Sequence, residues 1–139
     1  MPSKPKTWQE KFQSDRKPEV KLLSFDFAGL KRGTTMLVSS PAEIDKFIRK
    51  IPTGKSVSIE ELRAALAKKH KADSACPAST PIFLRVVSEA AFEAVKAGKS
   101  FDEITPFWRV VHPESKLAQK LECGADLIRS LRANEGIID

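Results

Sequence analysis

Few side chains in this 139-residue chain could act as nucleophiles or metal ligands. The two cysteines, Cys76 and Cys123, lie far apart in sequence, and neither forms a metal-ligand spacing with His70 or His112. A nucleophilic cysteine needs a neighbouring base or positive charge that lowers its thiol pKa. Cys76 precedes Pro77 and has no histidine paired with it in sequence. We therefore expect reduced structural thiols in a cytoplasmic protein, with no metal and no cofactor.

Basic residues are unevenly distributed along the chain, whose formal net charge is +6. Residues 46–71 are strongly basic, since Glu60 and Glu61 are their only acidic residues, whereas residues 89–139 are mildly acidic. This asymmetry indicates a face that binds a polyanion such as DNA or RNA, although a merely solvated face is the alternative. The lysines that we expect near phosphates are Lys50, Lys55, Lys68, Lys69 and Lys71.

The N-terminal part of the chain predicts two small elements. Residues 1–18 form a basic arm in which Trp8 and Phe12, four positions apart, fit a short amphipathic helix. This arm is either docked through Trp8 or mobile. Residues 19–39 predict a short β-hairpin, because two apolar stretches flank a link that contains two glycines.

The remainder of the chain predicts helices. Ser40 is a cap followed by proline, and Ser58 with Glu61 forms a capping-box pattern. Gly98 ends the third helix, whereas residues 99–118 lack a regular pattern. The predicted helices cover residues 40–50, 58–71, 81–97 and 124–133.

Residues 104–111, I-T-P-F-W-R-V-V, resemble the active-site segment of the O6-alkylguanine-DNA alkyltransferases, usually written P-C-H-R-V-V. Pro106, Arg109 and both valines stand in the matching places. Phe107 occupies the place of the acceptor cysteine, and Trp108 that of the histidine that activates it. The resemblance therefore implies a DNA-repair scaffold that has lost its chemistry and is not an enzyme.

Other motifs extend this resemblance in the same order over residues 40–139. Residues 51–57, I-P-T-G-K-S-V, are similar to the family's I-P-x-G-x-V, and residues 58–63 to its next helix start. Residues 85–90 resemble the recognition helix R-A-V-G-x-A, and residues 131–136 the ending L-L-x-x-E-G. The resemblance implies an α+β, mainly helical chain whose winged helix-turn-helix domain follows the short hairpin.

The family's functional residues carry over only in part. Its target base is flipped out of the duplex, because the O6 atom is inaccessible inside the stack. Arg85 matches the arginine that fills the gap, Ile59 replaces a tyrosine that pushes on the phosphate, and Glu135 matches the glutamate that orients the histidine. The resemblance implies a base pocket lined by Phe107, Trp108 and Ile59, with Arg85 and Arg109 beside it.

The residues themselves leave other interpretations of this site open. Phe107 and Trp108 could instead fill the cavity of a lost active site, because aromatic side chains are usually core. Arg85 should lie on the exposed side of the third helix, where Glu89, four residues later, could hold it in a weak surface ion pair. Glu89 and Glu93 would also repel phosphates on that face.

Two functions follow as expectations. The first is a non-catalytic alkyltransferase-like protein that binds double-stranded DNA, including alkylated DNA, and flags lesions for repair proteins. The alternative is a protein-interaction module that reuses the fold without DNA binding, favoured by Ile59 and the glutamates of the third helix. No apolar run approaches the roughly 18 residues that span a membrane, so no membrane partner is expected.

Overall fold

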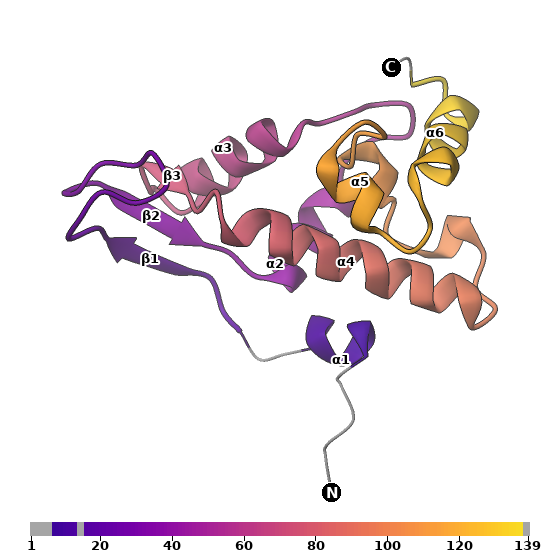
Figure 1. The fold of residues 1–139 in the computed structure, drawn as a ribbon, viewed down its shortest axis with the longest axis horizontal. Helices are drawn as coiled ribbons and strands as arrows, with labels where there is room; N and C mark the ends of the chain where they lie inside the picture. Colours follow the sequence, from indigo (N-terminus) through magenta and orange to yellow (C-terminus); the bar gives the residue numbers. More distant parts are fainter. Residues whose placement is uncertain (1–6, 14–15, 138–139) are drawn as a thin grey trace, which may run out of the picture.

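Three short strands form a sheet at one end of the molecule, and helices build the rest (Figure 1). The computed structural model describes residues 7–13 and 16–137. Strands β1 (Glu19–Leu22) and β2 (Thr35–Val38) are antiparallel, so the predicted hairpin pairing is confirmed. Strand β3 (Ser74–Ala75) runs parallel to β2 and was not predicted, since a two-residue strand has no periodicity to detect. The fold is α+β, with more residues in helices than in strands.

Local capping signals explain where the predicted helices begin. The Ser40 hydroxyl accepts the Glu43 N–H before α2, and Ser58 and Glu61 form the predicted capping box before α3. The helix predicted over residues 81–97 begins slightly earlier, at Ser79. The Thr80 hydroxyl does not cap it but donates to the Cys76 carbonyl. These helices are α2 (Pro41–Arg49), α3 (Ile59–Lys69), α4 (Ser79–Lys96) and α6 (Ala125–Asn134).

Residues 99–118, expected to be irregular, contain three short helical segments. Ser100 and Glu103 form a capping box around the first of them. Ser115 accepts the Ala118 N–H at the start of the last. The segments are η1 (Phe101–Glu103), η2 (Phe107–Arg109) and α5 (Lys116–Lys120).

The short helix α1 (Trp8–Phe12) packs against α4, and the prediction of an amphipathic helix there is confirmed. The Trp8 and Gln9 backbone N–H groups donate to the Glu93 carboxylate at 3.3 and 3.0 Å, and the Gln9 side-chain amide donates to the Ala90 carbonyl. Residues 7–13 of the arm are therefore docked. Its residues 1–6 and 14–15 lie outside the described residues.

The main core lies where α2, α3, α4, η2 and α6 meet. Its fully buried side chains include Ile44, Ile48, Leu62, Leu66, Leu84, Val87, Phe107 and Ile128. A second, small cluster joins Leu23, Met36 and Cys76 beside the sheet. Among the described residues, no helix combines the length and apolar character that crossing a membrane requires.

Candidate functional site

The segment that resembles the alkyltransferase active site forms η2 and packs against α4 and α6. Phe107 is 0% exposed and lies in the main core. Its ring meets the Trp108 ring edge to face, with the centroids 5.4 Å apart. Phe107 therefore fills the core, and its predicted place in a base pocket is wrong because no part of the side chain reaches a surface.

Glu135 collects four hydrogen bonds next to this segment. Its carboxylate accepts the Trp108 indole N–H at 2.8 Å and the Gly54 backbone N–H at 3.1 Å. It also accepts Nε and Nη2 of Arg109, each at 2.9 Å. The Arg109 and Glu135 side chains are each 12% exposed, so this bidentate ion pair is partly buried at the edge of a cleft. We call Trp108, Arg109, Glu135 and Gly54 the Glu135 network.

The loop before α3 completes the surroundings of Arg109. Arg109 donates from Nη1 to the Ile51 carbonyl at 2.8 Å and from Nη2 to the Thr53 hydroxyl at 3.0 Å. Gly54 has a φ of +86°, and a Cβ atom there would lie 3.1 Å from the Glu135 carbonyl oxygen. A side chain at this position would be strained and crowded, so the loop requires glycine.

Sequence analysis missed Arg132, which is 3% exposed. It donates from Nη1 to the Trp108 carbonyl at 2.8 Å and from Nη2 to the Ser56 hydroxyl at 3.2 Å. Its signal in the sequence is a position one helical turn before Glu135, on the same side of α6. Arg132 therefore holds the backbone of η2 through the Trp108 carbonyl. Glu135 holds the side chains of Trp108 and Arg109.

A cleft of about 580 Å³ opens beside the Glu135 network. Trp108 and Phe101 form an aromatic wall, with ring centroids 6.2 Å apart. The exposed Arg49 lies at the cleft and pairs with Asp45 at 3.0 Å. Asp102 and Asn134 add polar groups to the lining. We call this the Trp108 cleft; since Trp108 is only 5% exposed, the cleft offers mainly Phe101 and hydrogen-bonding groups to a small ligand.

Ile59 lies in a different cleft, of about 400 Å³, with Val110 and Val111. The lining residues described for the two clefts do not overlap. The predicted pocket of Phe107, Trp108 and Ile59 is therefore wrong as a single site. Successive side chains of the tight η2 turn point in different directions, which a linear motif does not specify.

The Arg85 side chain is 38% exposed, but neighbouring groups hold its guanidinium in this structure. Its guanidinium carbon lies 5.2 Å from the Trp8 ring centroid, and Nη2 donates to the Lys120 carbonyl at 3.3 Å. Nε lies 3.6 Å from Glu89 Oε2, so the predicted ion pair is present. It is not at the surface, because Glu89 is buried and accepts the Glu122 backbone N–H. Arg85 also lines neither cleft described above.

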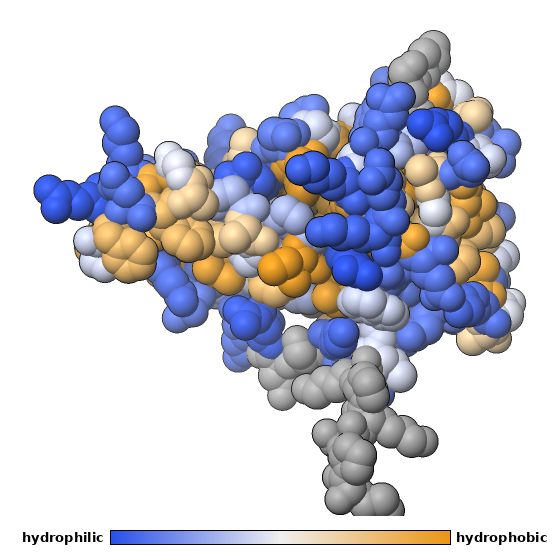
Figure 2. Space-filling view, in the orientation of Figure 1, coloured by the Kyte–Doolittle hydropathy of each residue, from blue (hydrophilic) through white to orange (hydrophobic). Residues whose placement is uncertain are grey.

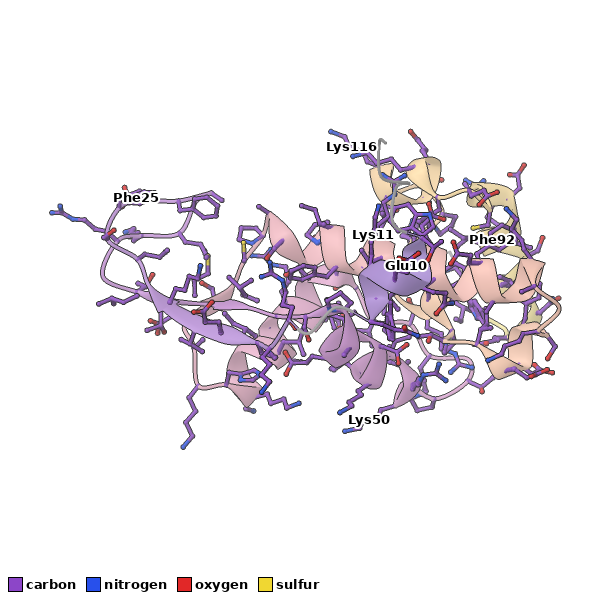
Figure 3. All side chains as sticks on the ribbon, turned by 90° about the horizontal axis from the view of Figure 1, so that it is seen from below. Glu10, Lys11, Phe25, Lys50, Phe92 and Lys116 are labelled. Atoms are coloured by element: carbon purple, nitrogen blue, oxygen red, sulfur yellow. The ribbon has the colours of Figure 1, made fainter. Side chains whose placement is uncertain are left out.

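The predicted phosphate-binding lysines are all exposed, but they form two groups. Lys50 and Lys55 lie in the link before α3, whereas Lys68, Lys69 and Lys71 lie at or just after its C-terminal end. The 11 residues of α3 separate the groups by about 16 Å. Lys50 projects away from the side that carries Lys11 and Lys116 (Figure 3). Their role at phosphates stays a prediction.

Neither thiol is placed for nucleophilic chemistry. Cys76 is buried in the small cluster with Leu23 and Met36. Burial, together with the nearby Glu89 and Glu122 carboxylates, raises the pKa of the Cys123 thiol to about 11. That thiol is therefore protonated at neutral pH, and neither cysteine lines the Trp108 cleft. In residues 7–13 and 16–137, no three His, Cys, Asp or Glu side chains gather as metal ligands.

Neither a family model, nor a curated protein, nor a solved structure matches the chain.

Proposed function

We propose that this chain is a non-catalytic, alkyltransferase-like protein that binds double-stranded DNA. The hydrogen bond between Trp108 and Glu135 carries the proposal. The motifs place these two residues where the family has its histidine and the glutamate that orients it. They are distant in sequence, yet the indole N–H meets the carboxylate at 2.8 Å. This contact is the one expected if the chain shares the family's histidine–glutamate arrangement.

Alkyl transfer is not part of the proposal, because the acceptor position holds the buried Phe107. The protein should take up no label from duplex DNA that carries methyl-labelled O6-methylguanine. Protein-bound label is measured after incubation, with an active alkyltransferase as the positive control. One methyl group per chain on Cys76 or Cys123 would contradict a non-enzymatic function.

The two lysine groups favour DNA as the polyanion. One group precedes α3 and the other lies at its C-terminal end, and the chain as a whole carries a net charge of +6, which favours binding to phosphates. The carboxylates of Glu89 and Glu93, which would repel phosphates at an exposed face, accept hydrogen bonds within the fold. Glu89 accepts a backbone N–H near α5, and Glu93 accepts two from α1. The α4 glutamates therefore no longer favour the protein-interaction alternative.

Duplex affinity should fall steeply with salt, with a log–log slope of about −0.9 for each phosphate contacted. Charge reversal of Lys68, Lys69 and Lys71 to glutamate should weaken binding to all sequences alike and flatten this slope. The same reversal at Lys96, Lys99 and Lys120, in the mildly acidic half of the chain, is the matched control. A fluorescence anisotropy titration at several salt concentrations measures both.

Duplexes with guanine or O6-methylguanine at one position separate lesion recognition from general DNA binding. In this structure the Arg85 guanidinium contacts the Trp8 ring of α1 and the Lys120 carbonyl, so filling a flipped-base gap requires it to give up these contacts. We expect at most a weak preference for the lesion. No binding to either duplex at low salt would contradict the proposed function.

A further inference from the structure

A groove of about 520 Å³ lies between α1, α4 and α5, remote from the Glu135 network. Ile82 lines it and is 61% exposed, so a large apolar side chain stands uncovered there. The half-buried Leu117 continues the apolar surface, the buried Val86 lies at its base, and Trp8 closes one side. Figure 2 shows apolar side chains over the first half of α4, next to hydrophilic ones over α5. Apolar grooves with a polar rim are typical of protein docking sites.

The rim of this groove is positively charged. Lys11, Lys116 and Lys120 line it, and none of its described lining residues is acidic. Figure 3 shows that Lys11 of α1 and Lys116 of α5 lie on the same side of the molecule. The fourth cation of the groove, Arg85, is partly neutralised by Glu89 at 3.6 Å. The three lysines therefore favour a partner that carries carboxylates around an apolar centre.

The aromatic ring in the groove argues against a nucleic acid as the occupant. Lys11 Nζ lies 4.2 Å from the Trp8 ring centroid, and the Arg85 guanidinium carbon lies 5.2 Å from it. These cation–π contacts already use the ring that an unpaired base would need for stacking. Ile82, Val86 and Leu117 in turn have nothing to offer phosphates.

We infer that this groove binds an acidic amphipathic segment of a partner protein. Its large apolar side chains would cover Ile82, Val86 and Leu117, and its carboxylates would meet Lys11, Lys116 and Lys120. A helix with apolar residues at i, i+3 and i+4 and acidic residues between them fits this pattern. The groove shares no described lining residue with the Trp108 cleft, and the inference uses Ile82 and the three lysines without Arg85, so it does not rest on the proposed DNA binding.

The inference is tested by selecting phage-displayed random peptides of about 16 residues on the immobilised 139-residue chain. Selected peptides should be rich in Asp and Glu and should carry Leu, Ile, Phe or Trp at helical spacing. One selected peptide, synthesised with a fluorescent label, is then titrated against variants. Ile82→Glu should weaken its binding at least about tenfold, as expected for a central apolar contact.

Matched variants make the result specific. Ile82 and Leu22 are both exposed large hydrophobics, so neither substitution by glutamate should affect folding. Leu22→Glu, on β1, should leave peptide binding unchanged. Lys116→Glu with Lys120→Glu should weaken it, whereas Lys68→Glu with Lys71→Glu should not. Thermal unfolding of each variant confirms that it is folded.

Several outcomes would overturn the inference. These are no enrichment of peptides, enrichment without acidic residues, and equal loss for Ile82→Glu and Leu22→Glu. A fourth is loss of duplex DNA binding on reversal of Lys116 and Lys120 while Ile82→Glu changes nothing. The groove would then be a phosphate-binding surface. Failure of DNA binding elsewhere would leave the peptide result unaffected.

Discussion

Replacing Glu135 by alanine should lower the free energy of unfolding by about 2–3 kcal/mol, because it leaves the partly buried Arg109 guanidinium without its carboxylate. The same change removes the acceptor for the Trp108 indole and the Gly54 N–H. The free energy of unfolding of a whole domain is only about 5–15 kcal/mol, so this loss is a substantial part of it. Urea unfolding followed by circular dichroism measures the loss.

The control for this substitution is Glu114→Ala. Glu114 is 76% exposed and meets Arg129 only at 3.8 Å, so its removal should change stability by less than about 0.5 kcal/mol. Arg109→Lys tests the geometry of the pair, because an ammonium cannot reproduce the planar fork that also reaches Ile51 and Thr53. A loss below about 1 kcal/mol in Glu135→Ala would contradict a structural role for the network.

The Glu135 network should also make stability depend on acid pH. Burial alone would raise the pKa of Glu135, but hydrogen bonds from Arg109, Gly54 and Trp108 outweigh it and lower the pKa below 4.5. A carboxyl group with a lowered pKa in the folded state binds fewer protons than in the unfolded state. Its contribution is therefore fully present above about pH 4.5 and is lost as the pH falls through the folded-state pKa.

Glu135→Gln should accordingly lose less stability than the wild type between pH 6 and pH 3, as unfolding midpoints at several pH values would measure. Some acid sensitivity should remain, because the pKa of Glu43 is lowered as well. Burial opposes that change, whereas hydrogen bonds from Ser39 and His70 and the charge of His70 favour it. Parallel pH profiles for wild type and Glu135→Gln would contradict the assignment of this acid dependence to Glu135.

Most of the helices could be predicted because their signals are local. A cap such as Ser58 and its partner Glu61 lie within one turn, so sequence neighbours determine where α3 begins. Strand β3 could not be predicted, because two residues have no pattern and pair with β2 only once the chain has folded. The docking of α1 likewise depends on Glu93, which is far away in sequence.

The sequence predicted only some members of the candidate site, and it did not predict the directions of their side chains. The motifs marked Trp108, Arg109 and Glu135, and the structure brings these three into contact. The motifs could not specify that Arg109 donates its hydrogen bonds to Glu135, Ile51 and Thr53. The exposed position expected for Glu89 was also wrong, because α4 is covered by α1 on one side and contacts the segment after α5 on another. The spacing of apolar residues along a helix indicates one buried face, but it does not show when other elements cover the polar faces as well.

Phe107→Ala should destabilise the protein by about 3–5 kcal/mol, the usual cost of removing a buried phenyl group and leaving a cavity. Phe107 is 0% exposed and also supports Trp108, whose ring lies edge to face against it. Phe107→Leu retains most of the volume and should cost clearly less, about 1 kcal/mol. Urea unfolding at neutral pH compares the variants with wild type. Similar losses for alanine and leucine would mean that the side chain does not fill the core.

Phe107→Cys restores the residue type of the alkyltransferase acceptor at this position, and yet it should accept no methyl group from O6-methylguanine. The side chain there faces the core and not a cleft, and burial in apolar surroundings raises the pKa of a thiol. The base expected beside it is replaced by Trp108, whose N–H only donates. In the native state this thiol should react slowly with a thiol reagent, and it should react at once after unfolding in urea. Stoichiometric methylation of Phe107→Cys would show that a flipped base reaches η2, which would sink the assignment of Phe107 to a closed core.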